Sequence, residues 1–240
     1  MNNLDNGSCW DAYFKYRSVD KSLYKDHKLA NYVAACLPKE SSATIADLGC
    51  GFGQNLLAMR KMGYTNCYGV EPSEEASAWV ASQGIDVFRT TIEKFASERP
   101  RLAKFVLMTH VLEHIPKDRV IPVLSQIRES ILDSDGMLLV AVPNAASVTH
   151  CYWRYEDWTH TCLFTSGSLL FVLQAAGFSN IEIIDPDSMM KTRPWVRPLR
   201  RACLSVYKRY LNALCRLTDS SFHKSSPLVL SFEVKALAKK

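Results

Sequence analysis

The sequence has no long apolar run, no cysteine pair at metal-binding spacing and, near its end, a long interval without negative charge. No stretch reaches the ~18 apolar residues that a membrane-spanning helix needs, and the first residues do not form a signal peptide. Eight cysteines are scattered without a C-x-x-C pair, which argues against a zinc site and a disulfide scaffold. These absences favour one globular domain, residues 1–240, in a reducing cytoplasm.

The interval without negative charge lies between Asp187 and Asp219. Eight basic residues fall inside it: Lys191, Arg193, Arg197, Arg200, Arg201, Lys208, Arg209 and Arg216. Without them the chain would hold fewer basic than acidic residues, so the formal net charge of +5 is local. A local positive charge indicates a local anionic partner.

The same interval predicts a helix with one apolar face, within a basic insertion at residues 186–226. Six apolar residues advance in steps of three or four: Trp195, Leu199, Cys203, Val206, Tyr210 and Leu214. Pro194 and Pro198 fit only at the beginning of such a helix. The apolar face can pack on the domain, with the basic residues solvated. Alternatively, residues 191–216 contact an anionic membrane or an anionic substrate.

A buried strand, a glycine turn and a helix follow one another near residue 50. The turn contains three residues without side chains: Gly49, Gly51 and Gly53. A ligand can therefore lie against bare backbone, and the helix that starts at Gln54 offers unpaired N–H groups. A dinucleotide fingerprint needs a glycine where Gln54 stands, and Asp47 would repel a pyrophosphate but attract a cation. An NAD(P) oxidoreductase is therefore disfavoured.

Two further motifs carry a resemblance to a known family. Glu71 ends the next apolar strand, where a carboxylate can accept both hydroxyls of a ribose. D-x-G-x-G-x-G followed by such an acid resembles motif I of the class I S-adenosylmethionine (SAM) methyltransferases. The string T-H-V-L-E-H at 109–114 resembles the motif of the branch that methylates small molecules, quinones and sugars. Base amino methyltransferases carry a P-P-[Y/F/W] clamp at this point; it is absent here, so nucleic acid is not the expected acceptor.

The resemblance implies SAM as cofactor and an α/β, Rossmann-like fold. Its seven strands would have the order 3-2-1-4-5-7-6, with helices on both faces. The cofactor-binding residues carried over are Asp47, Gly49, Gly51, Gly53, Glu71, Thr91, Ile92, Thr109 and His110. Residues 1–40, which hold an aromatic and basic cluster from Tyr13 to Arg17, would cover the cofactor pocket as a lid or pack on the sheet edge.

Hydrophobic periodicity places several further elements. An amphipathic helix is expected at 118–132, strand five at 137–142, and a closing pair of strands at 181–184 and 231–236. The segment 149–160 between them packs four aromatic rings, two histidines and two carboxylates. A loop of this composition over the strand ends is expected to determine substrate specificity.

The D-x-x-H-x-x-x-F-T pattern in this loop supplies the candidate catalytic residues. In similar enzymes the equivalent of His160 faces the substrate, so we expect His160 to act as general base, oriented by Asp157. A bracing hydrogen bond between the two is the alternative. Glu113 and His114 are interpreted as structural. No metal site of convincing spacing is found, although Asp157 and His160 could join a magnesium site as in some sugar methyltransferases.

The function expected is an O-methyltransferase that acts on a sugar hydroxyl of a cell-surface polysaccharide or its lipid-linked precursor. A quinone or other small-molecule O-methyltransferase is one alternative. A SAM-fold binding module without catalysis is another, disfavoured by the intact Asp47, Glu71 and glycines. The expected location is cytoplasmic, at the inner face of the membrane if the basic helix binds lipid.

Overall fold

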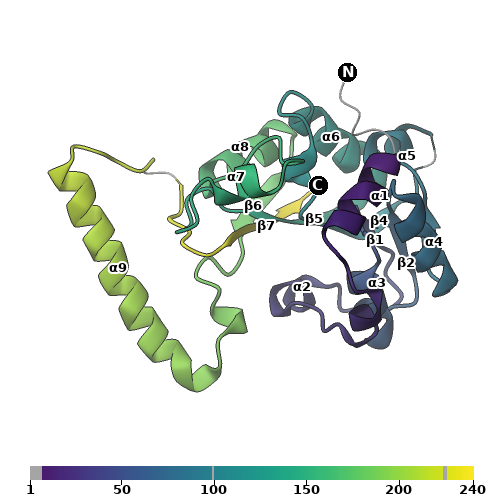
Figure 1. Cartoon of the computed structure of the whole chain (residues 1–240), viewed down its shortest axis with the longest axis horizontal. Coiled ribbons are helices and arrows are strands. Elements are labelled where there is room, and N and C mark those ends of the chain that lie inside the picture. The colour runs from purple at the N-terminus through teal and green to yellow at the C-terminus, as the bar shows by residue number, and fades with distance from the viewer. Residues whose placement is uncertain (1–6, 99, 224–225) are drawn as a thin grey trace.

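A seven-stranded sheet runs through the centre of the protein in the order β3-β2-β1-β4-β5-β7-β6 (Figure 1). The structure, a computed structural model, describes residues 7–98, 100–223 and 226–240. The strands are β1 (Ile45–Leu48), β2 (Cys67–Val70), β3 (Asp86–Phe88), β4 (Ala103–Thr109), β5 (Leu132–Pro143), β6 (Ser179–Ile183) and β7 (Glu233–Lys239). The pairs among β1 to β5 are parallel, and β7 is antiparallel to both its neighbours. The predicted fold and strand order are confirmed.

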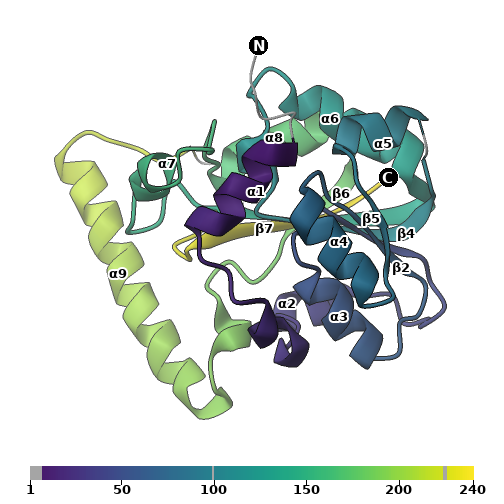
Figure 2. The same cartoon turned by 45° about the vertical axis from the view of Figure 1, so that its right-hand side comes forward.

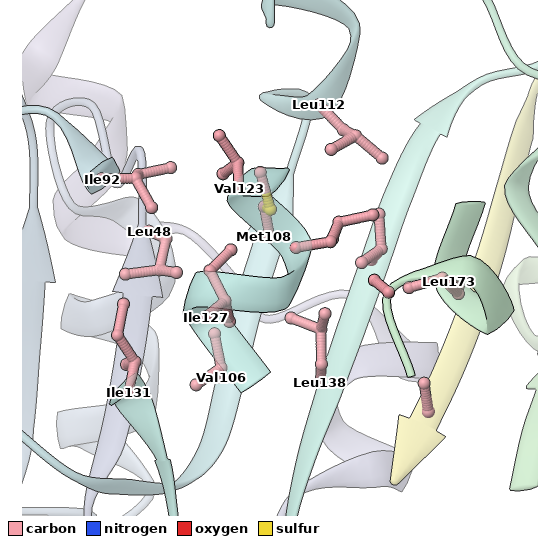
Figure 3. Close-up of a cluster of buried hydrophobic side chains, with 14 of the residues drawn as sticks. Leu48, Ile92, Val106, Met108, Leu112, Val123, Ile127, Ile131, Leu138 and Leu173 are labelled. Atoms are coloured by element: carbon pink, nitrogen blue, oxygen red, sulfur yellow. The ribbon is translucent and has the colours of Figure 1, made fainter. Parts of the chain in front are cut away.

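Helices cover both faces of this sheet. One face carries α5 (Ile92–Glu98), α6 (Val120–Gln126) and α8 (Ser166–Ala175), and the other carries α2 (Asn31–Cys36), α3 (Gln54–Lys61) and α4 (Glu74–Ser82). Successive residues of β4 alternate between the two cores: Val106 and Met108 pack under the first set, Phe105 and Leu107 under the second. Figure 3 shows the first core. Because both faces are buried, the central strands are mainly apolar, with Asp47 of β1 as a buried exception.

Helix α6 and strand β5 differ from the predicted boundaries. The predicted helix at 118–132 is α6 followed by one π-helical turn, Ile127–Ile131. Strand β5 begins five residues earlier than Met137, because Leu132 already pairs with Ala103 of β4. The intervening polar residues shift the register before pairing resumes at Met137 with Phe105. The periodicity therefore located both elements but missed the irregularity in the pairing of β5 with β4.

The N-terminal segment breaks into three short helices: α1 (Gly7–Tyr16), a 3₁₀ helix at Lys21–Asp26, and α2. Helix α1 is anchored to the start of α4, where Asp11 accepts hydrogen bonds from the Ser73 hydroxyl and the Glu75 backbone. Residues 1–6 of the predicted lid lie outside the described residues.

Helix α9 (Arg197–Leu217) stands apart from the sheet (Figures 1 and 2). Pro194 opens the preceding 3₁₀ turn and Pro198 lies in the first turn, as predicted. On its inner side, Lys208 pairs with Asp187 at 2.9 Å and Arg200 donates to the Asp187 carbonyl at 3.1 Å. Residues 224–225 of the predicted insertion lie outside the described residues.

The apolar face of α9 points away from the domain. Leu199, Val206 and Tyr210 are 67%, 64% and 59% exposed, and no residue of the helix is buried. The interpretation that this face packs on the domain is therefore wrong. Within the described ranges, no helix is long and apolar enough to cross a bilayer.

Candidate active site

A cavity of about 360 Å³ lies beyond the carboxyl ends of β1, β2 and β4. Ligands bind at this position in open parallel sheets, because the loops there diverge to opposite faces. Seven of the nine predicted cofactor-binding residues line it: Gly49, Gly51, Glu71, Thr91, Ile92, Thr109 and His110.

The glycine turn forms the floor of the cavity. Gly49 has a φ of +71°, and a Cβ there would lie 2.4 Å from Cγ2 of Val111, so no side chain fits. Gly51, with a φ of +52°, donates its backbone N–H to Glu71 at 2.9 Å. A second donor to Glu71 is the Ser73 backbone, also at 2.9 Å. Glu71 thus fixes the turn while it faces the cavity.

Asp47 and Gly53 do not line the cavity. Gly53 is the first residue before α3, and a Cβ there would lie 2.9 Å from Cγ2 of Val80, so it permits the close packing of α3 on α4. Asp47 is 1% exposed beneath the turn, and neither carboxylate oxygen accepts a hydrogen bond. Burial raises its pKa to about 7. An unpaired buried carboxylate at this point favours a positively charged ligand.

His110 lies at the end of β4 with a left-handed backbone, φ +56°. Its Nε2 contacts Glu233 Oε1 at 2.8 Å, and its Nδ1 lies 3.4 Å from Glu113 Oε1. Burial lowers the pKa of His110, but the two carboxylates outweigh it and raise the pKa to about 10. His110 is therefore an imidazolium near neutral pH, and it cannot accept a proton from a substrate.

The N-terminal segment covers part of the cavity. Three residues of α1 line it, Trp10, Tyr13 and Phe14, and so does Arg17, which follows the helix. The Phe14 ring packs 4.9 Å from the Phe52 ring of the glycine turn. The N-terminal segment therefore lies over the pocket.

The loop after β5 contains α7 (Tyr152–Glu156) and brings Asp157 and His160 together, each 5% exposed. His160 Nδ1 donates to the Trp153 carbonyl at 2.6 Å, because a carbonyl oxygen can only accept. The other ring nitrogen, Nε2, lies 3.6 Å from Asp157 Oδ2. Trp153 rather than Asp157 therefore orients the ring. Neither Asp157 nor His160 lines the cavity, but the ring of His114, which does, is 4.7 Å from that of His160.

The outer side of the same loop presents aromatic rings to solvent. Tyr152, Tyr155 and Trp158 are 52%, 74% and 89% exposed. Large apolar side chains gathered at the surface beside a pocket are typical of a binding surface.

Comparison with known proteins identifies the family. The family model described as "Methyltransferase domain" matches residues 22–183, which is more than half of the chain. The chain belongs to this family. No curated protein matches it by sequence.

Solved structures share the fold of this methyltransferase domain. A SAM-dependent methyltransferase from Archaeoglobus fulgidus matches with a TM-score of 0.65 and 20% identity, covering 96% of this chain and 99% of that one. A Haloferax volcanii putative methyltransferase in complex with the Trm112 activator matches with a TM-score of 0.60 and 16% identity, covering 99% of each chain. The plantazolicin methyltransferase BpumL in complex with SAH matches with a TM-score of 0.56 and 17% identity, covering 95% and 88%. The expected enzyme class is confirmed, and the oxidoreductase alternative is wrong.

The residues present in the pocket fit SAM. The bare backbone at Gly49 and Gly51 admits a ligand at close range, and Glu71 stands where its carboxylate can accept hydrogen bonds from a ribose diol. The unpaired carboxylate of Asp47 fits the positive charge of the cofactor.

Sequence reasoning missed one group of residues. Glu113 and His114 were interpreted as structural, yet they meet His160 in a buried cluster whose ligand-type atoms all lie within 4.8 Å of one another. Their adjacency in the sequence was a signal, but their meeting with His160 depends on how the loop after β5 folds back over β4.

Proposed function

We propose that the protein is a SAM-dependent O-methyltransferase whose acceptor hydroxyl is deprotonated at the Asp157–His160 pair. The observation that carries this proposal is the buried pair Asp157–His160, whose imidazole ring contacts that of His114, a residue that lines the cofactor cavity. In its neutral form, the ring of His160 keeps a lone pair on Nε2, since Nδ1 donates to Trp153. A hydroxyl needs such a proton acceptor, whereas a neutral amine needs less help.

The reaction is an in-line displacement at the methyl carbon. The acceptor oxygen would form a bond to this carbon while the carbon–sulfur bond breaks, and the electron pair of the broken bond would stay on the sulfur and neutralise it. The hydroxyl proton passes to the Asp157–His160 pair. SAM supplies an activated methyl group when bound, so the chain chiefly positions the two reactants. Helix α1, which lies over the pocket, would exclude water.

The acceptor we propose is a sugar hydroxyl of a cell-surface polysaccharide or its lipid-linked precursor. Tyr152, Tyr155 and Trp158 offer exposed rings on which a sugar can stack, next to the catalytic pair. The outward apolar face of α9 is bordered on one side by exposed Arg209 and Arg216, a pattern suited to an anionic membrane surface. Such a surface is where a lipid-linked sugar would be found.

Radiolabel transfer tests this function. The full chain would be incubated with methyl-labelled SAM and with separated glycolipid, polysaccharide and quinone fractions of the producing cells. We expect label in a glycan fraction, stable to mild base as an ether is. Label in the quinone fraction would support the small-molecule alternative instead. No transfer to any hydroxyl-bearing fraction, with SAM binding intact, would contradict O-methylation.

A further inference from the structure

Three buried groups with free lone pairs converge beside the cofactor cavity: Glu113, His114 and His160. The Glu113 side chain is fully buried, and neither of its oxygens accepts a hydrogen bond. Its Oε1 lies 3.9 Å from Nε2 of His160. His110 Nδ1 lies 3.4 Å from Oε1, but a buried carboxylate that accepts no hydrogen bond is still costly to maintain, so a further partner is expected.

The proton positions of the two histidines can be assigned from their partners. The Thr159 hydroxyl has one hydrogen, which it donates to Asp157 Oδ1 at 2.5 Å. Thr159 Oγ1 also contacts His114 Nδ1 at 2.8 Å, so His114 must be the donor of that hydrogen bond. Nε2 of His114 is then left with a lone pair. The same holds for Nε2 of His160, because its Nδ1 donates to the Trp153 carbonyl.

We propose that Glu113, His114 and His160 bind a divalent transition-metal cation such as Zn²⁺. Two imidazoles and one carboxylate are the ligand set of catalytic zinc and non-haem iron sites, whereas Mg²⁺ prefers oxygen ligands. Three protein ligands leave further coordination positions open, and His114 lines the cofactor cavity. Metal–ligand bonds of about 2.1 Å would draw the ligand atoms, now within 4.8 Å, closer together.

The two histidines are held in place by hydrogen bonds of the kind that histidine ligands make around a metal. A histidine ligand usually donates its other ring nitrogen to a carbonyl or to a carboxylate-linked group, which fixes its orientation. Trp153 does this for His160, and Thr159, itself bonded to Asp157, does it for His114. His110 lies 2.8 Å from Glu233 and 3.4 Å from Glu113, and it leaves both oxygens of Glu113 without a hydrogen bond.

This inference rests on the proposed function and refines it. A cation bound here would take the acceptor oxygen and lower the pKa of its hydroxyl. His160 would then be a ligand, and the proton would pass to Asp157, whose Oδ2 lies 3.6 Å from the ligating nitrogen. The competing arrangement is a protonated His160 between Asp157 and Glu113, which needs no metal.

Cobalt binding tests the site without knowledge of the acceptor. The chelator-treated full chain would be titrated with Co²⁺, followed by its visible absorption, and with Zn²⁺ in competition. We expect one equivalent to bind, and the variants Glu113→Gln and His160→Gln to weaken binding by at least about tenfold. His223→Gln, which changes an exposed histidine outside the cluster, is the matched control and should bind as the wild type does.

Calorimetry with SAM separates failure of this inference from failure of the proposed function. Variants that still bind SAM are folded, so a selective loss of cobalt binding would locate the metal at the cluster. A wild-type chain that binds SAM but neither Co²⁺ nor Zn²⁺ would overturn the metal site and leave the methyltransferase proposal standing. Equal cobalt affinity in wild type and His160→Gln would also overturn it.

Discussion

The Tyr13 hydroxyl donates a hydrogen bond to Asp157 Oδ2 at 3.0 Å, across 144 residues of chain. Helix α1 is thereby tied to the loop that holds the catalytic candidates. The contact also protects the tyrosine from ionisation, because burial and then the Asp157 charge raise the pKa of Tyr13 well above its usual value. Helix α1 and the loop of the proposed acceptor site are therefore directly connected.

Replacing Tyr13 by phenylalanine should loosen α1 over the pocket. The variant loses only the hydroxyl that reaches Asp157, so we expect faster tryptic cleavage at Lys15 and Arg17 in the free protein. Tyr16→Phe is the control, since Tyr16 is 76% exposed. Unchanged cleavage kinetics in Tyr13→Phe, relative to this control, would show that the hydrogen bond does not hold the lid.

Asp47→Asn should weaken SAM binding, because the variant removes a buried negative charge but keeps the shape of the side chain. A charge-assisted interaction contributes at least ~1.5 kcal/mol, which is roughly a tenfold change in Kd. Calorimetry would measure the Kd of SAM for each variant. Asp118→Asn, a substitution at an exposed position, is the control. Undiminished affinity in Asp47→Asn, or tight binding of NADH by the wild type, would contradict the cofactor assignment.

SAM should stabilise the protein more at pH 8 than at pH 6. Burial raises the pKa of both Asp47 and Glu71 to about 7, against the 3.8 and 4.5 of the free groups. The folded protein therefore binds more protons than the unfolded chain between these values, and the ligand-free protein loses stability as pH rises through this window. A cationic ligand favours the ionised carboxylates, so its binding strengthens as pH rises through about 7.

Thermal unfolding at both pH values, with and without SAM, measures this linkage. The SAM-induced rise in Tm should depend less on pH in Asp47→Asn than in the wild type. A wild-type rise that is equal at the two pH values, or larger at pH 6, would show that neither carboxyl changes ionisation on binding.

His160→Ala should lower kcat by ~10²–10⁴, the usual effect of removing a proton acceptor, with SAM affinity nearly unchanged. The physical reason is that Nδ1 of His160 donates to the Trp153 carbonyl, which leaves Nε2, 3.6 Å from Asp157, as the nitrogen that can take the proton. Methyl transfer to the labelled acceptor fraction would be the assay, with His223→Ala as control. Wild-type turnover by the variant would make His160 a bracing residue.

Helix α9 should bind anionic but not neutral vesicles, and salt should weaken the binding. Each Lys or Arg near an anionic surface contributes roughly 1 kcal/mol, which is screened at high ionic strength. Val206→Asp places a charge on the exposed apolar face and should abolish flotation with the vesicles. Asn212→Asp adds the same charge at another exposed position of the helix, off the apolar face, and should reduce flotation only slightly. A wild-type protein that stays in the soluble fraction with both lipids at low salt would leave an anionic substrate as the reason for the charge.

The sequence by itself determined the sheet and most of the cofactor pocket. Strands such as β1 and β4 are mainly apolar on both faces because helices cover both, so their positions could be read from local hydrophobicity. The glycines and Glu71 also act through local geometry, a turn and a strand end. Motif and position were therefore sufficient to place Gly49, Gly51 and Glu71 at the cavity.

Only the tertiary structure decided how the distant parts meet. Which nitrogen of His160 is free depends on the Trp153 carbonyl, and the cluster with Glu113 exists because the loop after β5 folds back over the end of β4. The periodicity of α9 showed an apolar face but not its direction. That direction is set by the inner contacts of Arg200 and Lys208 with Asp187, which leave the apolar face in solvent. Periodicity fixes which residues share a face, whereas the side on which that face lies is determined by long-range contacts.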